Sequence, residues 1–227
     1  MIPLHALYFS LYYFNFEVSR KWRSNNLPWS WEIKGQNFSL IHQIICYLGQ
    51  IFIVYLPFMY FVSLLYTPPA IYTDSKCPSF ISTYSWFVFN IFLEDFFFYF
   101  IHRLLHTDFL YKKIHKIHHR CINTIHINCI YTHPIEFVIG NLLPSYVGYL
   151  MFYDRVHFVS QSVWLITRFV YTHIGHGGYD FPFTITGFNY INKVEAGFHN
   201  FHHSKNSGNY GSVFSLWDNI FGTSKPY

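Results

Sequence analysis

Histidines gather in three short clusters between residues 102 and 203. The clusters are His102 and His106; His115, His118 and His119; and His199, His202 and His203. Residues three or four apart lie on the same face of a helix, so each cluster can direct its imidazoles toward one point. With 15 histidines in 227 residues, the pattern His-x-x-His-His is expected about 0.06 times by chance, yet it occurs twice. Because imidazole is the commonest metal ligand, the clusters predict metal binding.

The number of histidines indicates more than one metal ion. The clusters supply eight imidazoles, which exceeds what one four- or six-coordinate ion can use, and His173 and His176 add a further pair. We therefore expect two ions, with ligands drawn from ten histidines. These are His102, His106, His115, His118, His119, His173, His176, His199, His202 and His203. Imidazole accepts zinc, copper, iron or nickel, so the ligands alone do not select the metal. An imidazole pKa near 6.5 predicts metal release below about pH 6.

The helix expected to lead into the first cluster carries two acidic residues, Glu94 and Asp95. A polar stripe along it, at i, i+4, i+7 and i+11, consists of Asp95, Tyr99, His102 and His106. Carboxylates inside a membrane segment are costly and are normally paired or functional. We expect Asp95 or Glu94 to orient a ligand imidazole or to pair with Arg103 or Arg168. The alternative is an interfacial carboxylate bonded to water or to arginine.

The elements that must position these residues are apolar helices. Charged residues make up only 11% of the chain and aromatic residues 23%, whereas soluble domains have about 25% charged residues. Four long apolar segments are expected to cross a bilayer core of about 30 Å. They are residues 38–66, 80–101, 134–153 and 157–174. The sequence therefore predicts an all-α integral membrane protein with about four transmembrane helices and a cytosolic, helical, histidine-rich cap.

The distribution of positive charge predicts the orientation of the chain. Lysine and arginine concentrate in residues 17–37 and 102–120, which the positive-inside rule places in the cytosol with the C-terminus. Residues 1–16 are apolar but have neither a basic start nor a small-residue cleavage site, so they are expected to form a short anchor or interfacial helix. We divide the chain into an N-terminal membrane anchor region, residues 1–79, and a single catalytic unit, residues 80–227.

Other classes of function receive less support. The four cysteines form no Cys-x-x-Cys pair, which predicts free thiols. The net charge of +4 is small and dispersed, which disfavours nucleic-acid binding. A metal transporter is a remote alternative, because the clusters lie at the ends of the expected spans and in the tail instead of lining several spans at mid-depth.

Taken in order, these motifs resemble the fatty acid hydroxylase/sterol desaturase superfamily of membrane di-iron oxygenases, and most closely its methylsterol monooxygenase branch. The blocks that carry the resemblance are residues 94–95, 102–106, 110–119, 133–136, 176–182, 199–203, 207–210 and 217–223. These separate blocks lie between about residues 90 and 225, a region that makes up about 60% of the chain.

The resemblance implies two non-haem irons that use O2 to hydroxylate an unactivated C–H bond. The sequence contains neither a Gly-x-Gly-x-x-Gly loop nor a Cys-x-x-Cys-His motif, so electrons must come from another protein. The family implies cytochrome b5, fed by an NAD(P)H-dependent reductase, and a location in the endoplasmic reticulum. Its methylsterol branch oxidises the C4-methyl group of a sterol in steps. Glu94, Asp95, His133, Glu136 and Asn200 are expected to support the ligands, with His133 alternatively a ligand or a helix cap.

Several departures keep the substrate open. Asn200 stands where the branch usually has Asp, and residues 124–126 replace its Pro-Phe-Gly with Thr-Ile-His. Ile130 replaces a usual Glu. His126 has no assigned role and is left out of the ligand set. The alternatives are another lipid hydroxylase of the superfamily, acting on a fatty acid, a sphingolipid or a sterol side chain, and an inactive relative that binds sterol.

Overall fold

The computed structural model describes residues 2–14, 16–24, 28–29, 39–65, 76–181 and 196–226. Parts of the polar stretch 17–37 and of the connection 67–79, together with Pro182, lie outside the described residues. Every regular element within them is a helix, beside one isolated bridge between Arg23 and Tyr179. The elements are α1 (Ile2–Phe14), α2 (Glu17–Arg20), α3 (Leu40–Gly49), η1 (Gln50–Tyr55), α4 (Leu56–Leu65), α5 (Phe80–Leu105), α6 (Asp108–Lys113), η3 (His115–Arg120), η4 (His126–Ile130), α7 (Pro134–Glu136), η5 (Phe137–Leu142), α8 (Leu143–Phe152), α9 (Phe158–Gly175), α10 (Ala196–Lys205) and α11 (Leu216–Ile220).

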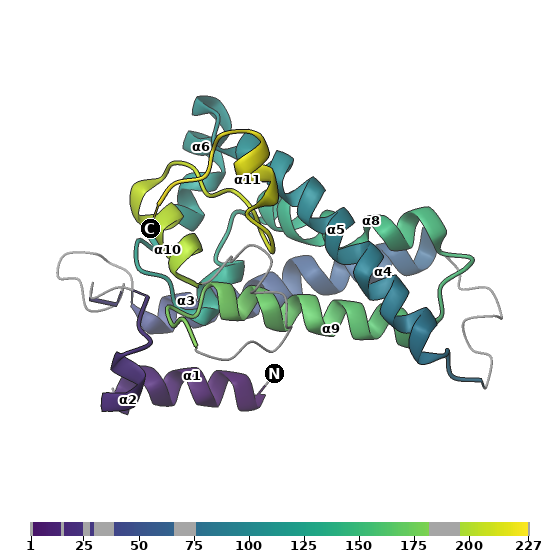
Figure 1. Ribbon diagram of the computed structural model, residues 1–227, viewed down its shortest axis with the longest axis horizontal. Coiled ribbons are helices and arrows are strands. Elements are labelled where there is room, and N and C mark those ends of the chain that lie inside the picture. Colours follow the sequence, from purple (N-terminus) through teal and green to yellow (C-terminus); the bar gives the residue numbers. More distant parts are fainter. Residues whose placement is uncertain are drawn as a thin grey trace.

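The long helices lie side by side and form a bundle (Figure 1). Helix α5 contacts both α8 and α9, and η1 contacts η5. Two of the bundle helices contain a π-helical turn, η1 between α3 and α4 and η5 between α7 and α8. Side-chain oxygens cap the beginnings of two helices, because Ser39 accepts from the His42 amide and Ser79 from the Ser82 amide. These caps define where the apolar segments become helical.

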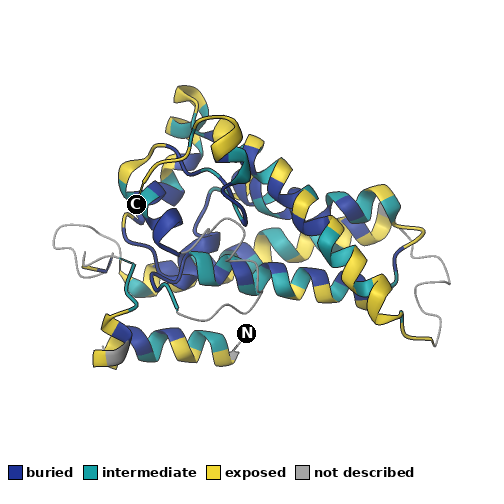
Figure 2. Cartoon of the chain, viewed as in Figure 1, coloured by how far each residue is buried: buried dark blue, intermediate teal, exposed yellow. Residues whose placement is uncertain are grey.

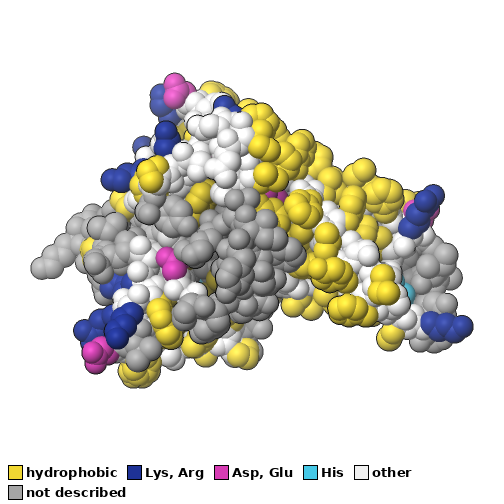
Figure 3. Space-filling view, in the orientation of Figure 1, with side chains coloured by type: hydrophobic (Ala, Val, Ile, Leu, Met, Phe, Trp, Pro, Cys, Tyr) yellow, Lys and Arg dark blue, Asp and Glu magenta, His cyan; other side chains and the backbone are white. Residues whose placement is uncertain are grey.

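Among the residues that the structure describes, two helices have the length and hydropathy of a membrane span, Leu40–Leu64 and Pro134–Phe152. The sequence predicts four spans, and the other two segments are also long helices, α5 with 26 residues and α9 with 18. Buried polar side chains such as Asn90 and Arg168 lower the mean hydropathy of α5 and α9. On the face of the bundle that Figure 3 shows, hydrophobic side chains nevertheless make up a broad part of the surface.

The N-terminal helix α1 packs against the protein along one side. Tyr8, Leu11 and Tyr12 are buried in a core with Ile125 and Tyr179, whereas other α1 side chains are exposed. The Tyr12 hydroxyl donates to the Gly177 carbonyl at 3.1 Å. Helix α1 is therefore attached to the segment that follows α9.

The short helices and the C-terminal segment form a cap at one end of the bundle, where buried residues concentrate (Figures 1 and 2). Two buried carboxylates hold this segment in place. Asp95 accepts from the amides of residues 212–214 through Oδ1, at 2.7 to 3.2 Å. Asp218 accepts from the amides of Tyr210 and Gly211. The cap thus rests on α5, which also carries the first histidines.

Candidate metal centre

The structure brings nine of the ten predicted ligands into two compact groups. The five-histidine group consists of His102, His106, His115, His119 and His202. The four-histidine group consists of His118, His176, His199 and His203. Within each group the ligand nitrogens all lie within 4.8 Å of one another. Residues that are up to 100 positions apart in sequence, such as His102 and His202, therefore face a common point.

Each His-x-x-His-His cluster divides between the two groups, which differs from the expectation that it points to one centre. The first and last histidines share a group, as His115 and His119 do, whereas His118 belongs to the other group. The same division separates His202 from its neighbours in α10. Consecutive residues are about 100–120° apart around a helix, so they face different directions. One short helix therefore supplies ligands to both groups.

Hydrogen bonds at Nδ1 orient five of these imidazoles. The acceptors are Tyr210 O for His102, Glu136 Oε1 for His115, Tyr131 O for His118, Thr172 O for His176 and Gly208 O for His202, at 2.6 to 3.2 Å. A neutral imidazole that donates through Nδ1 has only a lone pair at Nε2. Such bonds fix the tautomer that binds a metal through Nε2.

The Nε2 atoms point toward one another inside each group. Neighbouring Nε2 atoms lie 2.9 to 3.4 Å apart, as between His106 and His115 and between His176 and His199. His118 and His176 both donate through Nδ1, so the lone pairs of their facing Nε2 atoms repel unless a cation lies between them. Imidazole nitrogens bind first-row metals at about 2.1 Å, which places neighbouring ligands about 3.0 to 3.4 Å apart in octahedral or tetrahedral shells. The donor set and its spacing fit a metal ion in each group.

Burial keeps these imidazoles neutral. Desolvation, followed by repulsion from other histidines, lowers the pKa of His106 to about 2. Desolvation likewise lowers the pKa of His118 to about 3, and it lowers the pKa values of His199 and His202 well below the ordinary value. Metal binding needs deprotonated ligands, so the folded chain presents them in the required state at neutral pH.

Of the residues expected to support the ligands, Glu136 makes the direct contact. Its Oε1 accepts from Nδ1 of His115 at 2.8 Å, and both side chains are buried. Glu94 lies instead against Arg168, with Oε1 at 2.6 Å from Nη2. Asp95 binds backbone amides of the C-terminal segment and touches no ligand imidazole within the described residues.

The structure places three other predicted residues away from the ligand nitrogens. His133 caps α7 by accepting from the Ile135 amide at 3.2 Å, which is the capping alternative. Asn200 donates through Nδ2 to Ser24 and Asn123. His173 belongs to neither group. Neighbouring residues of an α-helix point in directions about 100° apart, so His173 faces a different direction from Thr172.

His173 lies in a separate aromatic cluster that the sequence motifs did not reveal. The Tyr47 hydroxyl lies 3.2 Å from Nε2 of His173 and 3.3 Å from Nε2 of His5. The ring of His126, whose role the sequence left open, lies 5.0 Å from that of His5. This cluster joins α1, α3, η4 and α9, and a histidine pattern within one segment gives no signal of such a contact.

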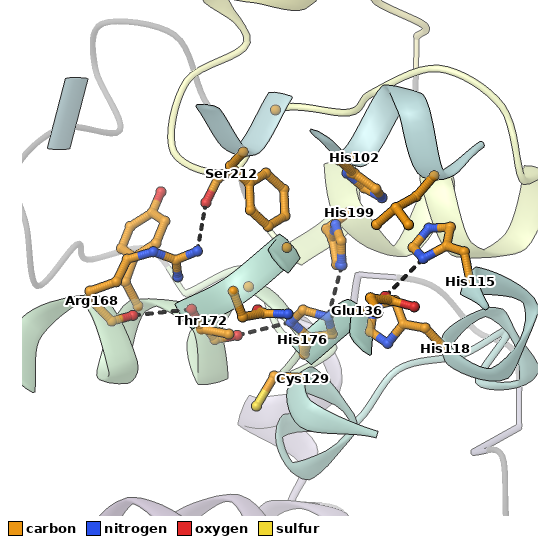
Figure 4. A pocket seen from close by; sticks show the side chains of 17 residues that line it. His102, His115, His118, Cys129, Glu136, Arg168, Thr172, His176, His199 and Ser212 are labelled. Carbon is orange, nitrogen blue, oxygen red and sulfur yellow. Dashed lines mark hydrogen bonds and ion pairs between the residues drawn. The ribbon is translucent and has the colours of Figure 1, made fainter. Parts of the chain in front are cut away.

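Two cavities lie beside the histidines. A small cavity of about 50 Å³ is lined by imidazoles of both groups, Glu136 and Arg168 (Figure 4). A larger one, of about 340 Å³, has mainly apolar walls from η1, η5, α8 and α9, including Ile51, Phe137 and Leu165. The buried Cys129 lines the small cavity as a free thiol, and all four cysteines are free, as predicted.

The described residues form a helical bundle with two membrane-span candidates, and its cap holds buried imidazoles in two groups that could each hold a metal ion. The sequence profile described as "Fatty acid hydroxylase" matches residues 87–223, which include all nine grouped histidines. The chain belongs to the fatty acid hydroxylase family.

Curated relatives agree with this assignment. The chain is 38% identical over 139 residues to methylsterol monooxygenase 1 of Gallus gallus, covering 60% of this chain and 44% of the relative. It is 42% identical over 137 residues to a putative methylsterol monooxygenase of Dictyostelium discoideum, covering 60% and 48%. It is 36% identical over 151 residues to fatty acid hydroxylase domain-containing protein 2 of Macaca fascicularis, covering 65% and 42%. The match thus spans about half the length of these relatives. No solved structure matches the chain.

Proposed function

We propose that this protein is a membrane di-iron monooxygenase that oxidises a C–H bond of a lipid, namely the C4-methyl group of a sterol. The observation that carries the proposal is the pair of imidazole groups next to an apolar cavity. Membership of the fatty acid hydroxylase family supports lipid hydroxylation, and similarity to methylsterol monooxygenases favours a sterol. Bound iron would supply the reductive activation of O2 that oxidation of such a bond needs.

The side chains of this protein hold and orient the centre. In this proposal the nine grouped histidines are the ligands, and Glu136 fixes the ring of His115 through the 2.8 Å bond to Nδ1. The backbone carbonyls of Tyr131, Thr172 and Tyr210 do the same for three other rings. The apolar walls of the larger cavity exclude water and accept the lipid, so the substrate can approach without leaving an apolar environment.

We propose that α5 and α9 cross the membrane together with the two candidate spans, which gives four transmembrane helices. Residues 80–227 then form the catalytic unit, and residues 1–79 form the membrane anchor region. Basic side chains at the histidine end support a cytosolic position for the cap, since Lys112, Lys113, Lys116 and Arg120 are all exposed. This end would face the endoplasmic reticulum's cytosolic side and receive electrons from cytochrome b5 and its NAD(P)H-dependent reductase.

The proposal is tested on the full chain, purified in lipid nanodiscs and analysed for metal. We expect two irons per chain and an O2-dependent oxidation of a 4-methylsterol when NADPH, cytochrome b5 and its reductase are added. Fatty acids and sphingolipids serve as competing substrates in the same assay. Products from the acyl lipids alone would replace the sterol with another lipid substrate, and a chain that binds zinc but no iron would contradict an oxygenase.

A further inference from the structure

Three residues form the boundary between the two cavities. Asn141, Arg168 and Thr172 line both the apolar cavity and the small cavity that the imidazoles face. In Figure 4, Arg168 and Thr172 lie on the opposite side of the small cavity from His102 and His115. A lipid that fills the apolar cavity and extends toward the histidines must therefore pass these three side chains.

Arg168 is a buried arginine whose guanidinium group is only partly satisfied by hydrogen bonds. Its Nη2 donates to Glu94 at 2.6 Å and to Ser212 Oγ at 3.1 Å, and this pair joins α9 to α5. The side chain is only 7% exposed, yet its Nε–H has no acceptor among the described residues. A buried donor without an acceptor is costly. An oxygen atom brought by a ligand would satisfy it.

Asn141 provides a second polar group at the same boundary. It lies in the π-helical turn η5, and such turns occur frequently at functional sites. Its side chain makes no hydrogen bond with another described residue, and a carboxamide both donates and accepts. Thr172, in contrast, already donates its hydroxyl proton to the Arg168 carbonyl at 3.1 Å. Asn141 and Arg168 are therefore the side chains at the boundary that have an N–H donor free for a ligand, whereas the Thr172 hydroxyl can only accept.

The charge at the boundary selects the kind of oxygen that fits. Glu94 is fully buried and offsets the charge of Arg168, so the pair is neutral as a whole. A carboxylate added here would bring a further negative charge close to the buried carboxyl groups of Glu94 and Asp95, which is unfavourable. A hydroxyl group carries no charge, accepts from an N–H and donates to the Asn141 oxygen. The boundary is therefore suited to an alcohol and not to an acid.

We infer that Asn141 and Arg168 are positioning residues that bind the hydroxyl group of the lipid substrate. The lipid then lies hydroxyl-first in the apolar cavity, and the carbon that reacts is a near neighbour of the carbon that bears the hydroxyl. This inference rests on the proposed function and narrows it, because a sterol has its C3 hydroxyl next to C4, whereas a free fatty acid presents a carboxylate.

The test compares three radiolabelled lipids on the full chain in nanodiscs. They are a 3-hydroxy-4,4-dimethylsterol, its 3-deoxy analogue and palmitate. The variants are Asn141→Leu, which removes the amide at similar size, and Arg168→Lys, with Asn219→Leu on the exposed side of α11 as the matched control. We expect the wild type and the control to bind the hydroxysterol about tenfold more tightly than the deoxy analogue. We expect Asn141→Leu to lose most of this preference with unchanged affinity for the analogue.

A structural defect would weaken both sterols equally, so the ratio of the two affinities isolates positioning. Equal binding of both sterols by the wild type, or a preference unchanged in Asn141→Leu, would overturn the inference, and so would palmitate binding tighter than the hydroxysterol. If Arg168→Lys does not fold, Asn141→Leu alone decides. Oxidation of both sterols at equal rates would reject the positioning role and leave the proposed function intact. A preference for the hydroxysterol in binding, without oxidation of any lipid, would reject the proposed function and leave the binding of the hydroxyl group intact.

Discussion

The contact between Glu136 and His115 makes a quantitative prediction about metal affinity. Replacing Glu136 with Leu removes the acceptor at 2.8 Å and leaves the Nδ1–H of His115 buried without a partner. An unsatisfied buried donor costs about 1–3 kcal/mol, and loss of such a ligand-orienting partner typically weakens metal binding by about 10- to 100-fold. We expect a loss in this range for the five-histidine group, and a smaller loss for Glu136→Gln, which keeps an acceptor.

The assay follows iron per chain during titration with a chelator. If the chain binds two irons as proposed, Glu136→Leu should release one iron at a lower chelator concentration than the wild type does and should keep the other like the wild type. Glu17→Leu on the exposed face of α2 is the matched control and should behave as the wild type. Circular dichroism before titration establishes that each variant is folded. A folded Glu136→Leu protein that keeps both irons with wild-type affinity would refute the argument that this contact supports the ligand.

Three further predictions concern the histidine groups. His118→Ala and His202→Ala remove ligands from different groups, so each should abolish lipid oxidation and reduce the iron content from two to one, as elemental analysis would detect. Burial lowers the pKa of His118 to about 3. The stability that the neutral imidazoles contribute is therefore complete above about pH 6.5 and is lost as the pH falls toward the folded-state pKa, which urea unfolding of the metal-free chain should show. Because burial delays protonation of the ligands, the protein should also retain metal well below about pH 6. Asn200→Asp should leave iron stoichiometry unchanged, because Asn200 contacts Ser24 and Asn123 instead of an imidazole; a change in iron content would contradict this placement.

Local sequence patterns predicted the helical class and most of the histidines that the structure brings together. Long apolar segments give helices because backbone groups without water must bond within the segment, and the observed α5 and α9 correspond to two of the predicted segments. A spacing of three or four residues aligns side chains on one face of a helix. Nine of the ten histidines that were predicted from this spacing lie in the two groups. These properties depend on neighbours within one segment, so the sequence alone contains them.

Contacts between segments were decided only by the tertiary structure. The division of His118 from His119, and the exclusion of His173, depend on where α9 and η3 meet the other histidines. Glu94 had several partners open to it, and the packing of α5 against α9 selected Arg168 at 2.6 Å. The Nδ1 acceptors are mostly backbone carbonyls, which every residue carries, so no residue type marks them. Helix periodicity determines which side chains share a face, but only packing determines what that face meets.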